Sequence, residues 1–470
     1  MAVPVITILQ MRQWEAATWA SGQTEADVIR RVGKRVAKRA RKLTREDDAI
    51  LVLAGKGHNG ADARAAQEFL DERKVEILDV ISPADDLPKL QELLGKDFAL
   101  IIDGLFGIGL NRPLDGDWQK FIAAVNASKI PVLAVDVPSG LSCETGEPMG
   151  AAIEAALTLA VGAPKTGMLA APAWAFVGRL EVLDNVGLVP CPIKSELHWT
   201  FPDDFKDYPP LRTIAAHKGS FGHLAIVAGS LGFHGASVLT ARGAQRAQPG
   251  LITLFTQEAT YYPVAAQLQS TMVTIWRPDN KQFDKASAIL IGPGMAAPDV
   301  PEELKNTVRR LWRDFPHPII IDASALDWIG SHALPKNLIR VVTPHPGEAA
   351  RMITSTPQKI QSNRAQAVRD ISRRYGNCWV VLKGHQTLIG RSEGEIHVNP
   401  SGNPHLAQGG SGDVLSGLIA GFLAQPALQA DPGVAIRYAV WRHGYAADEL
   451  QSQGGNWAVE DLLAELGNPV

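Results

Sequence analysis

The chain has 470 residues, a length at which proteins usually divide into two or more domains. Hydrophobic residues make up 46% of it and charged residues 20%, as in ordinary globular proteins, and the formal net charge is −3. This balance indicates neither nucleic acid nor a membrane surface as a partner. The basic stretch 30–45 fits the solvated face of a helix.

The cysteines Cys143, Cys191 and Cys378 lie far apart and in no Cys-x-x-Cys spacing, so neither a disulfide framework nor a zinc site is expected. This suits a reducing compartment, and we expect a cytoplasmic protein. Residues 1–20 lack a basic start followed by a long apolar core, so no signal peptide is expected. No apolar run approaches the about 18 residues of a membrane span.

Along the first half, short β-branched runs alternate with longer amphipathic stretches, which predicts a mostly parallel sheet with helices on its faces. We predict strands over 49–54, 75–80, 99–102, 132–135 and 156–161. We predict helices over 25–43, 63–73, 87–94 and 118–127. Glycine, aspartate or proline follows each strand, and ligand sites form at such carboxyl ends.

The stretch 189–213 interrupts this alternation with prolines and mixed charges, and we interpret it as a linker. A second alternation follows, with strands predicted over 224–228, 251–255, 288–291, 318–321, 341–343 and 378–382. An apolar helix over 414–423 follows a cluster of glycines. We therefore predict two different α/β domains, residues 1–205 and 206–470.

Aspartates end two predicted strands of the first half, Asp103 after 99–102 and Asp136 after 132–135. Together with the loop 55–62, which opens a helix, their turns would converge at one sheet edge and hold a phosphate-bearing ligand. Oxygen atoms of Asn59, Asp103 and Ser139 would also suit a hard cation. The alternative is that these aspartates only cap the turns that follow them.

In the second half, a glycine-rich loop, Gly409-Gly410-Ser411-Gly412-Asp413, runs directly into an apolar helix. Its glycines permit close backbone approach, and the first helical turn presents N–H groups to a phosphate. A carboxylate would be a poor phosphate ligand there, so we interpret Asp413 as the base for a substrate hydroxyl. The alternative is an ordinary first-turn aspartate.

Four further residues suit the same ligand. Lys383 and Thr387 follow a predicted strand, where an ammonium and a hydroxyl group would meet phosphate. His345 lies between two prolines and would donate to a carboxamide or a hydroxyl group; alternatively, it is a loop histidine satisfied by the backbone. Ala236 opens a helix where small residues allow a flat ring to lie against the backbone.

The second half resembles the ribokinase superfamily and, more closely, the ADP- or ATP-dependent NAD(P)H-hydrate dehydratases. The matching segments, in the family's order, are His217-Lys218-Gly219-Ser220-Phe221-Gly222, Ala228-Gly229-Ser230, Gly235-Ala236, Gly292-Pro293-Gly294, Thr343-Pro344-His345-Pro346-Gly347-Glu348, Leu382-Lys383-Gly384-His385-Gln386-Thr387, the Gly-Asp loop and His443-Gly444. The resemblance implies a ribokinase-like three-layer sandwich. Its reaction would be phosphorylation of the C6 hydroxyl of hydrated NADH or NADPH, followed by loss of phosphate.

This resemblance also assigns roles to single residues. It implies that Asp413 is catalytic. It implies substrate contacts from Ala236, Gly294, His345 and Asp413. It implies nucleotide contacts, with magnesium accompanying ADP or ATP, from Lys383, Gly384, His385, Gln386, Thr387 and Gly412.

The first half resembles the NAD(P)H-hydrate epimerases, from Gln10-Met11-Arg12 with Glu15 through Ala163-Pro164-Lys165-Thr166-Gly167. This resemblance implies a Rossmann-like three-layer sandwich, a potassium ion bound by Asn59, Asp103 and Ser139, and Asp136 as the acid/base. It implies further substrate contacts from His58, Asn59, Gly60, Ala61, Asp62, Asp136, Gly107, Ile108, Gly109, Leu110, Asn111, Arg112 and Pro113.

The first glycine loop departs from that family. The usual pattern is Asn-Asn-Gly-Gly-Asp-Gly, whereas this chain has His58-Asn59-Gly60-Ala61-Asp62-Ala63. A side chain at position 61 restricts any positive φ there, and His58 places a bulky ring where an amide is usual.

Three hypotheses follow. The first is a bifunctional epimerase and dehydratase of hydrated NADH and NADPH (NADHX and NADPHX), with these and ADP or ATP as its partners and with a homo-oligomeric state. The second is a ribokinase-like kinase of a thiazole or pyrimidine alcohol, which would release a stable phosphorylated product. The third, motivated by the altered loop, makes the N-terminal domain a ligand- or partner-binding module without catalysis.

Overall fold

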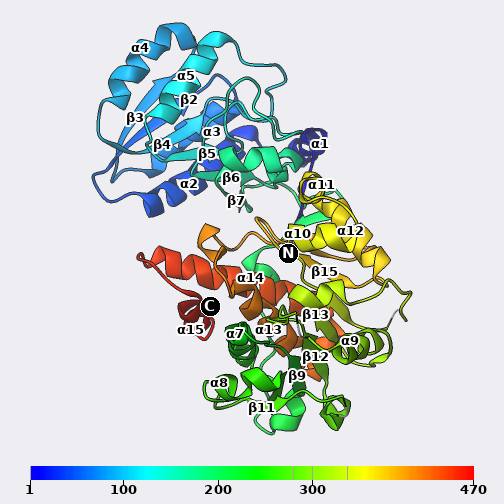
Figure 1. The fold of residues 1–470 in the computed structure, drawn as a ribbon. Coiled ribbons are helices and arrows are strands. Elements are labelled where there is room, and N and C mark those ends of the chain that lie inside the picture. The colour runs from blue at the N-terminus through cyan, green and yellow to red at the C-terminus, as the bar shows by residue number, and fades with distance from the viewer. Residues whose placement is uncertain (1, 279, 299, 336, 470) are drawn as a thin grey trace. The chain divides into compact units, whose positions relative to one another are not determined.

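The computed structural model describes residues 2–278, 280–298, 300–335 and 337–469, and it confirms two α/β units (Figure 1). The N-terminal unit is Val3–Trp199, and the C-terminal unit runs from Thr200 onward together with Ala2. The stretch interpreted as a linker contains a strand, β8 (Leu197–Trp199), which pairs antiparallel with β1 (Val3–Pro4). The domain boundary near residue 205 stays a prediction.

The N-terminal unit is built on a parallel sheet with the order β3-β2-β4-β5-β6-β7. Its strands are β2 (Ala49–Ala54), β3 (Lys74–Asp79), β4 (Phe98–Gly104), β5 (Val132–Val135), β6 (Leu157–Val161) and β7 (Arg179–Leu183). The first five confirm predicted strands, whereas β7 was not predicted. Because all of them are parallel, their carboxyl ends lie along one edge, where Asp103 and Asp136 are found.

Helices cover both faces of this sheet. They are α1 (Ile8–Ala20), α2 (Glu25–Leu43), α3 (His58–Ala65), α4 (Pro83–Leu94), α5 (Gly116–Ala127) and α6 (Trp174–Val177). Alternate residues of β2 face opposite layers: Ile50 packs in the cluster of α2 and α3, and Leu51 in that of α4 and α5. Helix α2 has the predicted bounds because the Thr24 side chain caps it by accepting from the Asp27 N–H.

The helix predicted over 63–73 was misplaced. It begins at His58 and ends, after a 3-10 turn, at Phe69. The sequence His-Asn-Gly has poor helix propensity. Close packing overrides that propensity: a Cβ at Gly60 would lie 2.0 Å from the Gly55 carbonyl oxygen, so only glycine permits this approach. Ala61 lies within the right-handed helix, so the restriction expected at that position does not arise.

The C-terminal unit has the strand order β17-β16-β15-β14-β13-β12-β9-β10-β11, parallel from β15 to β11 and antiparallel at β16 and β17. Its strands are β9 (His223–Val227), β10 (Leu251–Thr256), β11 (Met272–Ile275), β12 (Ala288–Ile291), β13 (Ile319–Ile321), β14 (Arg340–Val342), β15 (Trp379–Leu382), β16 (Leu388–Gly390) and β17 (Ile396–Val398). The predicted strands of this half are confirmed, whereas β11, β16 and β17 were missed.

Helices again form the outer layers of this unit (Figure 1). They are α7 (His234–Arg246), α8 (Tyr261–Ala265), α9 (Glu302–Asp314), α10 (Pro346–Met352), α11 (Pro357–Ser362), α12 (Arg364–Arg374), α13 (Ser411–Leu423), α14 (Pro432–Ser452) and α15 (Val459–Glu465). Helix α13 is apolar all round because it is buried among α7, α14 and the sheet. A Cβ at Gly417 would lie 2.1 Å from the Thr240 carbonyl oxygen, so glycine lets α13 approach α7.

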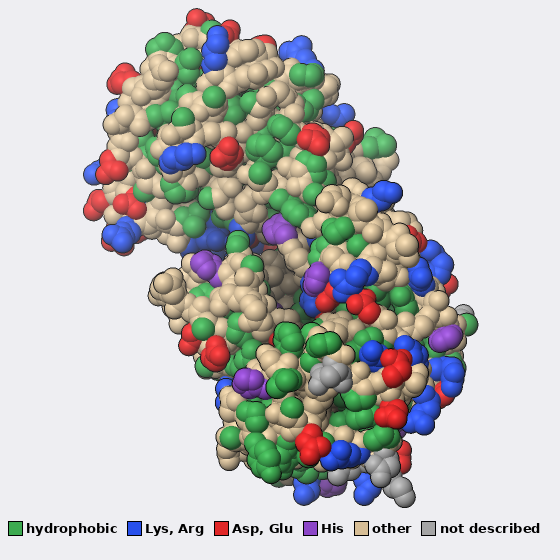
Figure 2. Space-filling view, viewed as in Figure 1, with side chains coloured by type: hydrophobic (Ala, Val, Ile, Leu, Met, Phe, Trp, Pro, Cys, Tyr) green, Lys and Arg blue, Asp and Glu red, His purple; other side chains and the backbone are tan. Residues whose placement is uncertain are grey.

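Acidic and basic side chains are interspersed over the face of the C-terminal unit seen in Figure 2. In the part of the chain that the structure describes, no helix combines the length and the apolar character needed to cross a membrane.

Candidate active sites

The carboxyl edge of the N-terminal sheet carries Asp136 in a constrained position. It directly follows β5 and has φ +60°, a left-handed conformation that is uncommon outside glycine. Its backbone N–H donates to the Leu159 carbonyl oxygen at 2.9 Å, and its Oδ1 accepts from the Val161 N–H at 3.0 Å. The neighbouring strand therefore holds both the backbone and the side chain of this residue.

Lys165 completes this arrangement, although the sequence interpretation gave it no role. Its side chain is fully buried, and its Nζ donates to Asp136 Oδ1 and, at 3.0 Å, to the Val161 carbonyl oxygen. An ammonium group that is removed from water in this way needs a partner charge. The ion pair with Lys165 thus restricts the side chain of Asp136.

The predicted cation ligands lie together at the same edge. Ser139 Oγ donates to Asp103 Oδ1 at 2.6 Å, and the Ser139 N–H donates to Asp103 Oδ2 at 2.8 Å. Burial raises the pKa of Asp103 to about 6, against these hydrogen bonds. Asn59 Nδ2 donates to the Phe106 carbonyl oxygen at 2.7 Å, whereas Asn59 Oδ1 is buried without a partner among the described residues. That free oxygen suits a bound cation.

Two more carboxyl groups belong to this edge, Glu15 on α1 and Asp62 on α3. Burial, and then the charges of Asp136, Glu15 and Glu25, raise the pKa of Asp62 to about 8. Burial and Asp136 also raise the pKa of Glu15. The carboxyl groups of Glu15, Asp62 and Asp136 therefore disfavour one another's ionisation.

The other predicted substrate contacts of this unit are more open. His58 is 80% exposed and forms an ion pair with Glu25 at 2.6 Å, so its ring does not fill the place of the usual amide. Gly107 packs against Asn59, since a Cβ there would lie 3.2 Å from the Asn59 Cβ. The segment from Ile108 to Pro113 contains no helix or strand. Whether it covers substrate phosphates stays a prediction.

In the C-terminal unit, Asp413 lies in the first turn of α13, directly after Gly410 at φ +96°. Burial, and then the negative charge of Asp322, raise the pKa of Asp413 to about 7, and Lys383 opposes this rise. A carboxyl group with that pKa exchanges a proton readily near neutrality. Its role as the base stays a prediction.

Lys383 follows β15 and donates from Nζ to Asp322 Oδ1 at 2.9 Å, with Glu348 Oε2 at 3.9 Å. Burial alone would lower the pKa of Lys383, but the charges of Asp322, Glu348 and Asp413 hold it above its usual value. Its side chain is still 20% exposed. The ammonium group is thus held in its charged form.

The remaining predicted substrate contacts lie on other segments of this unit. His345 caps α10: its Nδ1 accepts from the Gly347 N–H at 3.0 Å, as the backbone-satisfied alternative supposed, while its Nε2 lies 3.5 Å from Glu348 Oε1. Gly294, at φ +65°, and Ala236 pack together, since a Cβ at Gly294 would lie 2.8 Å from that of Ala236.

The loop after β15 contains the predicted nucleotide contacts. Gly384 has φ +131° and Gln386 φ +52°, and Thr387 Oγ1 donates to the Gly384 carbonyl oxygen at 3.1 Å. Burial, and then the charge of Arg364, lower the pKa of His385. A Cβ at Gly412 would lie 3.5 Å from Lys383 Nζ, which brings the two predicted phosphate-binding segments together.

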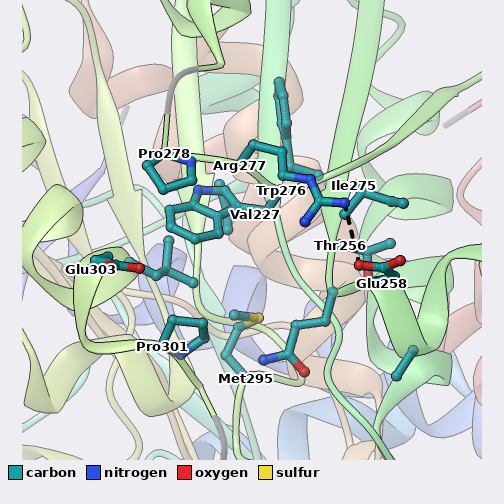
Figure 3. A pocket seen from close by; sticks show the side chains of 14 residues that line it. Val227, Thr256, Glu258, Ile275, Trp276, Arg277, Pro278, Met295, Pro301 and Glu303 are labelled. Atoms are coloured by element: carbon teal, nitrogen blue, oxygen red, sulfur yellow. Dashed lines mark hydrogen bonds and ion pairs between the residues drawn. The ribbon is translucent and has the colours of Figure 1, made fainter.

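The carboxyl ends of β10 and β11 border a pocket of about 420 Å³ (Figure 3). Arg277 and Glu258 form an ion pair beside it at 3.3 Å, and Trp276, Met295 and Pro301 contribute to its walls. Asp413 and Lys383 are not among its lining residues, although Met295 directly follows Gly294. The predicted catalytic groups therefore lie outside this pocket.

The sequence analysis named Glu15, Lys165 and His443 in the matching segments but gave them no role, and it missed Asp322 altogether. Asp322 carried a usable signal, because it follows the predicted strand 318–321 as Asp103 and Asp136 follow theirs. His443 is buried, which lowers its pKa to about 4, and its Nε2 donates to the Ser411 carbonyl oxygen at 3.0 Å. It holds the start of α13 in place.

Comparison with known proteins assigns both units. Residues 224–467 match the family model described as NAD(P)H-hydrate dehydratase, and residues 79–167 match the YjeF-related protein N-terminus. The bifunctional NAD(P)H-hydrate repair enzyme Nnr of Gloeobacter violaceus is 33% identical, over 99% of this chain and 97% of its own length. The chain belongs to the family of bifunctional NAD(P)H-hydrate repair enzymes. Both resemblances stated from the sequence are confirmed.

Other NAD(P)H-hydrate repair enzymes and one solved structure agree. The relative from Coxiella burnetii is 32% identical, over 95% of this chain and 94% of its own length. A ribokinase-like superfamily protein of Enterococcus faecalis is 25% identical with a TM-score of 0.51, and the match covers 58% of this chain and 95% of that protein. The ribokinase-like fold predicted for the C-terminal unit is confirmed.

Proposed function

We propose that the protein repairs hydrated nicotinamide nucleotides. The N-terminal unit interconverts the R and S epimers of NADHX and NADPHX, and the C-terminal unit dehydrates the S epimer at the expense of ADP or ATP. The observation that carries this proposal is Asp413, a half-buried carboxyl group whose pKa is raised to about 7, at the start of α13 beside Lys383. Similarity to the repair enzymes over nearly the whole chain supports the pairing of the two activities.

In the dehydratase reaction, Asp413 takes the proton of the C6 hydroxyl group while the oxygen attacks the terminal phosphoryl group. Lys383 and the N–H groups at the start of α13 stabilise the charge on the phosphates, since positioning and electrostatics supply most of the catalysis in phosphoryl transfer. Phosphate then leaves from C6 as the ring nitrogen donates its electron pair, and loss of a C5 proton gives NADH or NADPH.

Magnesium would accompany the nucleotide and neutralise phosphate charge. The carboxylates of Asp322 and Glu348, both buried beside Lys383, are oxygen ligands of the kind that this ion prefers.

A potassium ion fits the N-terminal edge. Asn59 Oδ1 is buried without a partner among the described residues. Asn59 and Ser139 both bond to the backbone of Phe106, and Ser139 bonds to Asp103. Oxygen atoms of these three types are what a hard cation binds. The ion would organise the loop of Phe106 and Gly107, to which Asn59 and Ser139 are already joined.

The direct test is incubation of the purified chain with a mixture of R- and S-NADHX and with ADP or ATP. We expect NADH to form until both epimers are consumed. Consumption of the S epimer alone would contradict the epimerase half, and no NADH at all would contradict both halves. Release of a stable phosphorylated alcohol instead would favour the small-molecule kinase.

A cytoplasmic location and a homo-oligomeric state belong to the same proposal. The three cysteines are all free thiols in the structure, as a reducing compartment would keep them. Size-exclusion chromatography with light scattering tests the oligomeric state, and a monomer at micromolar concentration would contradict it.

A further inference from the structure

Asp136 is one member of a four-residue cluster with Lys165, Glu15 and Asp62. The ammonium of Lys165 is its single buried cation and donates directly to Asp136. Glu15 and Asp62 both interact electrostatically with Asp136 and with Lys165. In the part of the chain that the structure describes, the cluster shares no side-chain hydrogen bond with the predicted potassium ligands: Asp103 and Ser139 bond to each other, and the bonds of Asn59, Asp103 and Ser139 otherwise go to Leu105 and Phe106.

Long-range pairing brings the cluster together. Ile6 pairs with Lys165: the Ile6 N–H donates to the Pro164 carbonyl oxygen at 3.0 Å, and the Thr166 N–H to that of Ile6 at 2.9 Å. Thr7 then caps α1, so Glu15 follows two turns later on a helix that starts beside Lys165. Asp62 arrives from α3.

The two oxygen atoms of Asp136 are not equivalent. Oδ1 accepts from Lys165 Nζ and from the Val161 N–H at 3.0 Å. Oδ2 accepts no hydrogen bond from any residue that the structure describes. Because the left-handed backbone and the ion pair both restrict the side chain, the free oxygen is held ready for a substrate proton.

Repulsion among the three carboxyl groups favours a proton on one of them. Lys165 is bonded to Asp136, and Arg12 and His58 act with it on Glu15. Burial, and then the charges of Asp136, Glu15 and Glu25, raise the pKa of Asp62 to about 8, while Lys165 acts in the opposite direction, so Asp62 is the member of the cluster in which the proton is favoured. Among the described residues, no hydrogen bond occupies the Asp62 side chain.

We propose that Asp136 and Asp62 are the base and the acid of the epimerisation, and that Lys165 is the positioning residue that orients Asp136. This rests on the proposed epimerase activity. Asp136 takes the proton of the C6 hydroxyl group, the C6=O double bond forms and the C6–N1 bond breaks, and N1 receives the proton of Asp62. Rotation about the C5–C6 bond presents the other face, and the reverse steps close the ring and return both protons.

The test uses the full chain, pure R-NADHX and no ADP or ATP, and follows both epimers by chromatography over pH 5–10. Asp62→Asn should lower kcat about 100-fold or more, since general acid/base groups contribute about 10²–10⁴-fold. It should also abolish the loss of activity above about pH 8 that deprotonation of Asp62 causes in the unmodified chain. Lys165→Met should lower kcat with little change in KM, and Lys165→Arg should restore part of it.

Lys96→Met is the matched control, because Lys96 forms an exposed ion pair with Glu76 at 3.3 Å. Thermal unfolding of each variant, followed by circular dichroism, reports whether its N-terminal unit is folded. An Asp62→Asn variant with unchanged kcat and an unchanged alkaline limb would overturn the acid/base pair, and so would a Lys165→Met effect confined to KM. Absence of epimerisation by the unmodified chain would instead contradict the proposed function.

Discussion

The two sites use the same groups in opposite ways. Each has one lysine among three carboxyl groups at a sheet edge. In the N-terminal unit, Lys165 is fully buried and bonds to Asp136, the predicted catalytic group. In the C-terminal unit, Lys383 is partly exposed and bonds to Asp322, while the carboxylate of Asp413 accepts no hydrogen bond from the described residues.

The difference follows from what each reaction requires. The proposed epimerisation needs proton transfer alone, so Lys165 is available to orient Asp136. Dehydration begins with phosphoryl transfer, so its lysine must stay accessible to phosphate. Burial, and then the charge of Asp322, raise the pKa of Asp413 to about 7, and no ion pair among the described residues holds this carboxyl group directly.

The largest expected effect separates the two sites completely. Asp413→Asn removes the base of the second reaction, and we expect dehydration of S-NADHX to fall about 10³-fold. Epimerisation of R-NADHX should be unchanged, because Asp413 belongs to the other unit. NADH absorbance and epimer chromatography measure the two rates. Asp314→Asn, in an exposed ion pair with Arg313, is the control.

Lys383→Met tests the accessible lysine. We expect a loss of about 10² in dehydratase kcat/KM, since a charge on the phosphates is left uncompensated. Lys383 lowers the pKa of Asp413, so its removal should move the ascending limb of the pH profile from near pH 7 to higher pH. A limb that does not move would contradict the coupling between these two groups. Lys305→Met, in an ion pair with Glu302, is the control.

Ser139→Ala tests whether the cation belongs to the N-terminal site alone. We expect the potassium concentration for half-maximal epimerisation to rise about tenfold, as for loss of one metal-site partner. Titration with potassium against a sodium background measures it, and the dehydratase rate of the same sample should not follow the change. Ser128→Ala, which removes a hydroxyl bonded to the Val125 carbonyl oxygen, is the control.

The smallest effect is on stability. The pKa of Asp62 is about 8 in the folded chain and about 3.9 when unfolded, so between these values the unfolded chain loses a proton that the folded chain keeps. Rising pH in this window therefore destabilises the fold. Asp62→Asn should therefore raise Tm at pH 8 and leave it unchanged below pH 4. An equal gain at both pH values would contradict a protonated Asp62.

Much of the fold could be predicted because it depends on local pattern. The runs 49–54 and 288–291 are apolar over the length of a buried strand, and they form β2 and β12 with those bounds. The helix at His58 could not be predicted, because its residues are poor helix formers and only the close approach of Gly60 to Gly55 favours it. Strand β8 could not be predicted either, because it lies in a proline-rich stretch and depends on pairing with the distant β1.

The sequence by itself determined the two α/β units, the aspartates at strand ends and the glycine-rich start of α13, because apolar period, turn chemistry and strand polarity are local properties. Only the tertiary structure decided which charges meet. Lys165 and Asp136 are 29 residues apart, and Lys383 and Asp322 are 61 apart. Such pairs depend on strand order and burial, which no local pattern contains, and they join Lys165 to Asp136 but Lys383 to Asp322 and not to Asp413.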